Sequence, residues 1–272
     1  MSLVIETCTA QHLGDRHEQQ DRVAIYSHGR AKSGKGPKSN MLAVLADGMG
    51  GHTGGELAAE QVLLHASQNF EAVTPTPDMV RDFLGSVIKD AHDAIRLTRY
   101  TSETEPHSTA CLLLLQNDRA DWAHCGDSRI YHFRNGKRVA RTVDHSYVMN
   151  LVQRGLITEM AADTHPNKNI LISCLGDEAE PRVEFGHASP LVGGDSFLLC
   201  SDGLWAYFSD LELARILNDY TPRKAAEFLI ETARTRAHGG GDNCSLAIVK
   251  VKEEVKTPLA RLGQRGFLDS GF

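Results

Sequence analysis

Five aspartates stand at the ends of predicted β-strands, and their recurrence constrains this chain more than any other feature of its sequence. Each lies beside small residues; they are Asp21, Asp47, Asp127, Asp202 and Asp242. A single aspartate in such a place is an ordinary turn signal, so one alone indicates little. Several rigid strands, however, can bring carboxylates to one point, where neighbouring glycines let backbone carbonyls approach. Mg²⁺ and Mn²⁺ prefer such oxygen ligands, so the pattern predicts a divalent-cation site.

The order of predicted strands and helices favours an α+β fold with antiparallel sheets. Asn135-Gly136 predicts a hairpin turn, Ser209 to Glu212 predict a capping box, and Pro222 predicts the first turn of a helix. Strands are expected at 3–9, 22–27, 41–46, 111–115, 121–125, 129–133, 197–200 and 245–251, and helices at 54–70, 78–97 and 147–154. Strands thus come in runs separated by helices, unlike a regular βαβ repeat.

Composition excludes several broad classes of protein. The chain has 272 residues and a formal net charge of −6, unlike the basic surface of a general nucleic-acid binder. No apolar run approaches the about 20 residues of a membrane span, and the first residues resemble no secretion signal. The six cysteines form no Cys-x-x-Cys pair, so buried free thiols are expected rather than a zinc site. We therefore expect a cytoplasmic protein that binds neither nucleic acid nor membrane.

Eight short segments between residues 5 and 251 resemble one family when they are taken in order. They are Arg16-His-Glu-Gln-Gln-Asp21, Asp47-Gly-Met-Gly-Gly-His52 with Gly55-Glu56, Ser108-Thr109, Gly126-Asp-Ser-Arg-Ile-Tyr131, Asp144-His-Ser146, His165-Pro166 with Asn169, Leu199-Cys-Ser-Asp-Gly-Leu-Trp205 and Asp242-Asn243. With these segments the chain resembles the metal-dependent protein serine/threonine phosphatases, the PPM or PP2C-type family, and in particular their compact bacterial members.

The resemblance implies a fold, an activity and partners. The fold would be two packed antiparallel β-sheets flanked by helices, in one domain at 1–252, with a flap at about 146–181 and a loose tail at 253–272. The activity would be hydrolysis of phosphoserine and phosphothreonine in proteins, with a metal-bridging hydroxide attacking phosphorus. The substrates would be phosphorylated proteins, the opposing enzyme a cognate Ser/Thr kinase, and the chain a monomer.

The same resemblance assigns the metal ligands, for Mn²⁺ or Mg²⁺. It implies that Asp47 bridges two tightly bound metals and that Gly48 offers its backbone carbonyl. Asp202 and Asp242 would complete the shell of one metal, and Asp21 would hold metal-bound waters.

Two further site residues follow from the resemblance. Arg16 matches the position that grips the substrate phosphate. Asp127, together with Asp202, matches a third and weaker metal site. Arg16, Asp21 and Asp47 are thus the expected catalytic residues.

The sequence departs from the family pattern at two positions. Gln20 stands where many relatives carry a glutamate, so a contact there would be neutral. Met49 replaces a histidine that eukaryotic relatives use as a proposed general acid, which leaves the proton donor open. His52 and His145 are possible substitutes, although an ordinary structural role is expected more often for such histidines.

Three alternatives fit the sequence less well. A cysteine phosphatase needs Cys-x₅-Arg, and no arginine stands six residues after any cysteine. A P-loop would start at Gly29-x₄-Gly34-Lys35, but Gly36 and Pro37 stand where Ser or Thr and a helix should follow. The third alternative is a catalytically inactive phosphatase-like binding or scaffold module, which is disfavoured because all five aspartates are present.

Overall fold

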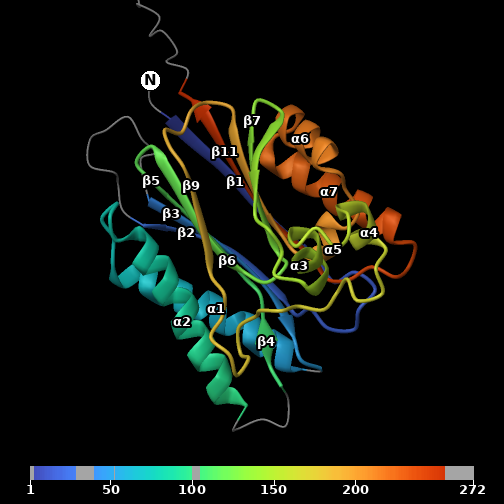
Figure 1. Ribbon diagram of the computed structural model, residues 1–272. Coiled ribbons are helices and arrows are strands. Elements are labelled where there is room, and N and C mark those ends of the chain that lie inside the picture. Colours follow the sequence, from blue (N-terminus) through green and yellow to red (C-terminus); the bar gives the residue numbers. More distant parts are fainter. Residues whose placement is uncertain (1–2, 29–39, 52, 100–104, 255–272) are drawn as a thin grey trace, which may run out of the picture.

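The computed structural model describes residues 3–28, 40–51, 53–99 and 105–254, and these residues form four layers (Figure 1). Two antiparallel sheets pack face to face in the middle, and helices cover the outer side of each sheet. The fold expected from the sequence is therefore confirmed.

The first sheet joins the two ends of the described chain. Leu3 pairs opposite Glu253, and the two strands that contain them stay paired along their whole length. Asn135 and Gly136 form the hairpin turn of this sheet, both with positive φ, as a mirror-image turn requires. The strand order is β1 (Leu3–His12), β11 (Cys244–Glu253), β10 (Asp195–Cys200), β7 (Arg129–Arg134) and β8 (Lys137–Arg141).

The second sheet is also antiparallel. Its order is β2 (Asp21–His28), β3 (Asn40–Met49), β5 (Ala110–Gln116), β6 (Arg119–Cys125) and β9 (Glu184–Ala188), and the short β4 (His107–Ser108) also pairs with β3. β3 and β5 lie inside the sheet and are covered on both faces. Their sequences are accordingly near-continuous apolar runs rather than alternating ones.

Seven helices are described, and five of them cover the sheets. α1 (Thr53–Ala72) and α2 (Val80–Thr98) lie on the second sheet, whereas α5 (Asp202–Trp205), α6 (Asp210–Asp219) and α7 (Pro222–Ala237) lie on the first. α3 (Tyr147–Gln153) and α4 (Glu159–Asp163) belong to the segment between β8 and β9. The capping box of Ser209 and Glu212 at the start of α6 is present, as is Pro222 in the first turn of α7.

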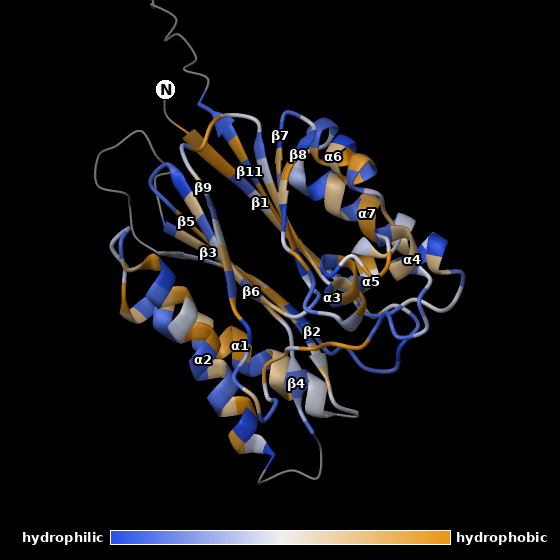
Figure 2. Cartoon of the chain, in the orientation of Figure 1, coloured by the Kyte–Doolittle hydropathy of each residue, from blue (hydrophilic) through white to orange (hydrophobic). Residues whose placement is uncertain are grey.

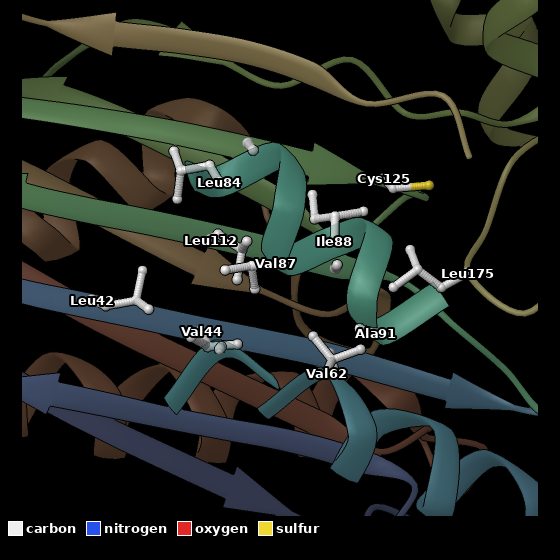
Figure 3. Close-up of a cluster of buried hydrophobic side chains, with 14 of the residues drawn as sticks. Leu42, Val44, Val62, Leu84, Val87, Ile88, Ala91, Leu112, Cys125 and Leu175 are labelled. Carbon is white, nitrogen blue, oxygen red and sulfur yellow. The ribbon is translucent and has the colours of Figure 1, made fainter. Parts of the chain in front are cut away.

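Three buried clusters hold the layers together, and β3 contributes to two of them. Leu42 and Val44 point towards α1 and α2, while Ala43 and Leu45 point towards the other sheet. In Figure 3, side chains of α2 such as Val87 lie over strands of the second sheet. Figure 2 shows apolar colour concentrated between the layers and polar colour on the outer helix faces. This two-sided packing fixes the strand register, because a slip of one residue would exchange the two faces.

The structure adds elements that the sequence pattern did not predict. β9 was missed, and β8 was implied only by the predicted hairpin turn, because both strands are partly exposed and carry charged residues or glycine. The short helices α4 and α5 were missed because they span one turn or little more. β11 continues to Glu253, one residue into the segment expected to be a loose tail.

Several sequence expectations concern residues outside the described part of the chain. These are the basic loop at 29–39, His52 and the tail from 255 to 272. All six cysteines are free thiols; four of them are buried, as expected, whereas Cys8 and Cys174 are half-buried. Among the described residues, no helix has the length and apolar character to cross a membrane.

Candidate metal centre

One edge of the sandwich collects all five aspartates, because antiparallel neighbours alternate in direction. Asp21 begins β2 and Asp47 lies near the end of β3, so the two meet at that edge. Asp127 follows the end of β6, which runs parallel to β3 across β5. In the other sheet, Asp202 follows β10 and Asp242 precedes the antiparallel β11.

Asp21 and Asp47 stand directly opposite each other in the β2–β3 pairing. Like charges in this position repel each other and destabilise a sheet. Asp21 is 1% exposed, and its Oδ2 accepts a hydrogen bond from Ser201 Oγ at 2.7 Å. Its Oδ1 is buried without a hydrogen-bond partner. A buried orphaned acceptor costs about 1–3 kcal/mol, so the pair is arranged for a cation or its hydration shell rather than for stability.

A cavity of about 570 Å³ opens over the aspartates. Its lining includes Asp47, Gly48, Asp127, Asp202 and Asp242. The lining also includes Asp15, Arg16, His17, Glu18, Gln20, Met49, Asn169 and Leu171. A second hollow of about 400 Å³ shares Asp127, Asn169 and Asp202 with the first and extends between α3, α4 and α5.

Crowding of carboxylates raises their pKa values. Burial, followed by the charges of Asp21 and Asp202, raises the pKa of Asp47 well above its ordinary range. Burial and the neighbouring Asp127 raise the pKa of Asp202 to about 8. Burial raises the pKa of Asp127 to about 7 and that of Asp21 to about 6. Each shift has the sign expected when anions are desolvated beside other anions, and a bound divalent cation would reverse it.

Arg16 is the basic side chain that lines this cavity. Its Nη2 lies 2.6 Å from Oδ2 of Asp242, and the side chain remains 62% exposed. The hydrogen bond to Asp242 and the charges of Asp242, Asp202 and Asp47 raise the pKa of Arg16. An exposed guanidinium at the mouth of the cavity can contact an anion that enters it.

The turn that carries Asp127 is held on two sides. Trp205 Nε1 donates to the backbone carbonyl of Asp127 at 3.0 Å, and its ring lies over Arg129, whose Cζ is 3.5 Å from the ring centroid. Arg129 in turn forms two hydrogen bonds of 2.8 Å with Asp144. On the other side, the backbone N–H of His145 donates to the carbonyl of Gly126, and its Nδ1 accepts from the Gly126 N–H. The carboxylate of Asp127 is thus supplied by a rigid turn.

Some of the other residues expected at the site line the cavity, and others do not. Asp21 lies behind the cavity rather than on its surface, whereas Gln20 and Met49 line it. His145 is 2% exposed and does not line the cavity, which supports the structural role that was expected more often for it than proton donation. The sequence reasoning missed Asp15, His17 and Glu18 as lining residues, because polar loop residues carry no pattern of their own.

His145 belongs instead to a cluster with the buried His124 and the half-buried Glu184. The two imidazole rings stack, with centroids 4.7 Å apart, so their in-plane lone pairs run side by side rather than converging. His145 Nδ1 already accepts from Gly126, which leaves the proton on Nε2 in the neutral ring. This geometry does not suit a second metal site.

The cavity as a whole does suit hard divalent cations. Its donors are carboxylates from both sheets together with the backbone at Gly48, which is buried against Gly55. A Cβ at position 48 would lie 1.9 Å from the carbonyl oxygen of Gly55, so only glycine fits there. The opposed Asp21 and Asp47, and the orphaned Oδ1 of Asp21, supply the negative charge and free oxygen that such cations require.

Comparison with known proteins gives a consistent result. The model of the protein phosphatase 2C family matches residues 9–243. The chain is 33% identical over 216 residues to the serine/threonine protein phosphatase PstP of Mycobacterium tuberculosis, covering 77% of this chain and 40% of that protein. It is 32% identical over 216 residues to the protein phosphatase PhpP of Streptococcus pneumoniae, covering 78% and 87%. The chain thus spans less than half of the length of the mycobacterial relative.

Solved structures agree with these matches. The Streptococcus agalactiae serine/threonine phosphatase superposes with a TM-score of 0.78 at 29% identity, covering 90% of this chain and 99% of that one. The catalytic domain of PstP, solved in complex with two manganese ions, gives a TM-score of 0.73 at 28% identity, covering 93% and 100%. The family expected from the sequence motifs is confirmed.

Proposed function

This chain belongs to the protein phosphatase 2C family, and from that premise we propose that it hydrolyses phosphoserine and phosphothreonine in proteins with the help of bound divalent cations. One observation carries the proposal: carboxylates from two sheets crowd around one cavity, with Arg16 at its mouth. An inactive binding module would gain nothing from the repulsion between Asp21 and Asp47. The relatives named as phosphatases support the same activity.

Asp47, Asp202, Asp242 and the backbone carbonyl of Gly48 would hold two cations, and Asp21 would act from behind through water. The manganese in the related PstP domain supports Mn²⁺, and Mg²⁺ suits the same oxygen donors. Asp127, which shares the cavity with Asp202, would hold a third and weaker cation. When bound, the cations supply Lewis acidity, which acidifies water and offsets charge on phosphoryl oxygens.

Residues of the chain itself would bind the phosphate and position the carboxylates. Arg16 would bind the phosphate through its guanidinium, which projects at the cavity mouth, and would orient the ester for in-line displacement. The pairing of β2 with β3 would hold the carboxylates of Asp21 and Asp47 in fixed positions, so that they need not rearrange during the reaction. Met49 lines the cavity and has no acidic proton, so the leaving oxygen must take its proton from elsewhere.

The substrate would be a phosphorylated protein rather than a small metabolite. Exposed residues such as Arg16 and Glu18 line the cavity together with Gly50 and Leu171, so the cavity is open to solvent and a side chain on a folded or extended polypeptide can enter. The segment at 146–181, with Asn169 and Leu171 at the cavity, would form the flap beside it. We further propose that the domain at 1–252 acts as a monomer and opposes a cognate Ser/Thr kinase.

The test is hydrolysis of a phosphothreonine peptide by the purified chain. Activity should require Mn²⁺ or Mg²⁺ and should stop when EDTA is added in excess. Full activity in excess EDTA would overturn the proposal. Phosphoproteomics of a deletion strain, complemented with either the wild-type chain or Asp202→Asn, would then identify the substrates.

A further inference from the structure

Asn243 ties the loop that carries Arg16 to the last strand. Its side-chain amide donates to the backbone carbonyls of Leu13 at 2.8 Å and Glu18 at 3.0 Å. Its Oδ1 accepts from the backbone N–H of Gln20 at 2.7 Å. Asn243 is 5% exposed, so each of these three bonds has one buried partner. One carboxamide thereby closes residues 13–20 into a ring, with Arg16 at its outer side.

A second contact strengthens the same junction. The backbone N–H of Asp15 donates to the carbonyl of Gly241 at 2.8 Å, and Asp15 Oδ2 accepts from the Gly241 N–H at 2.7 Å. The backbones also lie too close for a side chain, since a Cβ on Gly14 would meet the carbonyl oxygen of Asp242 at 2.1 Å. The Arg16 loop and the segment around Asp242 therefore move as one body.

The Asn243 contacts extend to the backbone beneath the proposed cations. The N–H of Gln20 donates to Asn243, and the carbonyl of the same residue accepts from the Gly48 N–H at 3.2 Å. Asn243 is thus linked to Gly48 through Gln20, and it contacts the Arg16 loop at Glu18, two residues from Arg16. Arg16, which would bind the phosphate, and Gly48, which would bind a cation, are therefore both anchored by Asn243.

We propose that Asn243 is a positioning residue, which fixes the distance between Arg16 and the carboxylates at 47, 202 and 242. This inference rests on the proposed function, since the value of a fixed distance lies in gripping a phosphate beside bound cations. Asparagine suits the position because it combines two donors with one acceptor in a short planar group. Aspartate has the same shape but would face two carbonyl oxygens with negative charge. The shorter side chain of serine could reach at most some of the three backbone groups that Asn243 contacts.

Amide hydrogen exchange tests the anchor without relying on activity. In Asn243→Asp and Asn243→Ser, the peptide covering residues 13–20 should exchange at least about tenfold faster than in the wild-type chain, because each hydrogen bond to a buried partner contributes about one power of ten. Peptides from α7 and β5 should exchange as before. Asn218→Asp is the matched control, since Asn218 lies on α6, where its side-chain amide donates to the neighbouring Asp219. Unchanged exchange at 13–20 in both variants would overturn the proposal.

A double-mutant cycle tests the link to Arg16. Asn243→Ser should lower kcat/KM on a phosphothreonine peptide about tenfold or more, and by a clearly smaller factor when Arg16 is already alanine, because only the support of Gly48 through Gln20 then remains to be lost. Losses that multiply would show that Asn243 acts independently of Arg16 and would overturn the proposal. If the wild-type chain hydrolysed no phosphopeptide, the proposed function would fail, whereas the exchange experiment would still decide whether Asn243 anchors the loop.

Discussion

The guanidinium of Arg16 lies against the carboxylate of Asp242, with Nη2 2.6 Å from Oδ2, although the two residues are 226 positions apart in the chain. A proposed phosphate-binding group thus touches a proposed metal ligand. In the cation-free protein the arginine offsets part of the negative charge of the cavity. Cations bound in the cavity would take over that task, and the guanidinium would then be able to turn to an incoming phosphate. An experiment can therefore distinguish the role of Arg16 in phosphate binding from the role of the aspartates in cation binding.

Replacing Arg16 by alanine should impair substrate use but not cation binding. Loss of a charge-assisted hydrogen bond of about 1.5–3 kcal/mol corresponds to a fall in kcat/KM of about 10- to 100-fold. Affinity for Mn²⁺, measured by calorimetry, should stay the same or rise, because the arginine no longer competes for Asp242. Arg16→Lys should recover part of the loss. Unchanged kinetics in Arg16→Ala would return this residue to the role of an ordinary surface arginine.

The cation-free protein should lose stability as pH rises. Asp21, Asp127 and Asp202 have pKa values of about 6, about 7 and about 8 in the folded chain, above the about 3.9 of an unfolded aspartate. Between these limits the folded state holds protons that the unfolded state has released. The stability that these bound protons give the folded state is therefore fully present below about pH 4 and is lost as pH rises through 6 to 8.

Thermal unfolding in EDTA should consequently give a lower Tm at pH 8 than at pH 5.5. Saturating Mn²⁺ should remove this dependence, since it stabilises the ionised form in proportion to its binding. A cation-free Tm that rises steadily from pH 5.5 to pH 8 would contradict the electrostatic description of the cavity.

Asp202→Asn should separate stability from activity. The neutral amide removes one of several crowded charges, so the cation-free Tm at pH 8 should rise by about 2–4 °C for each kcal/mol gained. Activity with Mn²⁺ should fall by several powers of ten, because a charged ligand is lost. Asp219→Asn, near the exposed end of α6, is the control and should change neither quantity. An active Asp202→Asn would exclude this residue from the metal ligands.

Much of the site was predictable because its signal is local. A carboxylate between a strand and a glycine can be read from the sequence at Asp47 and Asp202, and the antiparallel order then brings such strand ends together. The role of Asn243 could not be read, because its partners are backbone carbonyls up to 230 positions away. Backbone acceptors are the same at every residue and leave no pattern in a sequence.

The same difference between local and long-range signals explains which strands of the fold could be predicted. β3 and β5 were predictable because strands buried on both faces are continuously apolar. β9 was not, since Glu184–Ala188 lies at the sheet edge with a mostly half-exposed pattern, and Gly186 is there to accommodate Trp122. A Cβ on Gly186 would lie 2.4 Å from the indole, so tertiary contact rather than local preference selects that residue.

Asp195 should matter for stability and not for catalysis. Burial alone would raise its pKa, but hydrogen bonds from His132, Arg134 and the Val192 N–H outweigh it and lower the pKa to about 2. Asp195→Asn should cost about 3–5 kcal/mol, measured by urea unfolding, because it breaks a buried charge cluster. In the wild type this contribution is present above about pH 4 and is lost as pH falls towards 2. The exposed pair of Arg223 and Glu227 is the control; Glu227→Gln should cost under about 0.5 kcal/mol.

The last prediction concerns Asp127, whose carboxylate lines the cavity from a turn held by Trp205 and by His145. These contacts hold the backbone around Asp127 and do not involve its carboxylate, so Asp127→Asn should fold normally and keep two tight cation sites by calorimetry. If Asp127 helps to protonate the leaving oxygen, a task that Met49 cannot perform, the variant should lose most turnover on a phosphothreonine peptide. The loss should be much smaller on p-nitrophenyl phosphate, because nitrophenolate is a weak base and leaves without a proton. Equal losses on both substrates would exclude the protonation role while leaving a weak cation site possible. A variant with lower Tm but full activity per folded molecule would make Asp127 a structural residue of the turn, with no part in the reaction.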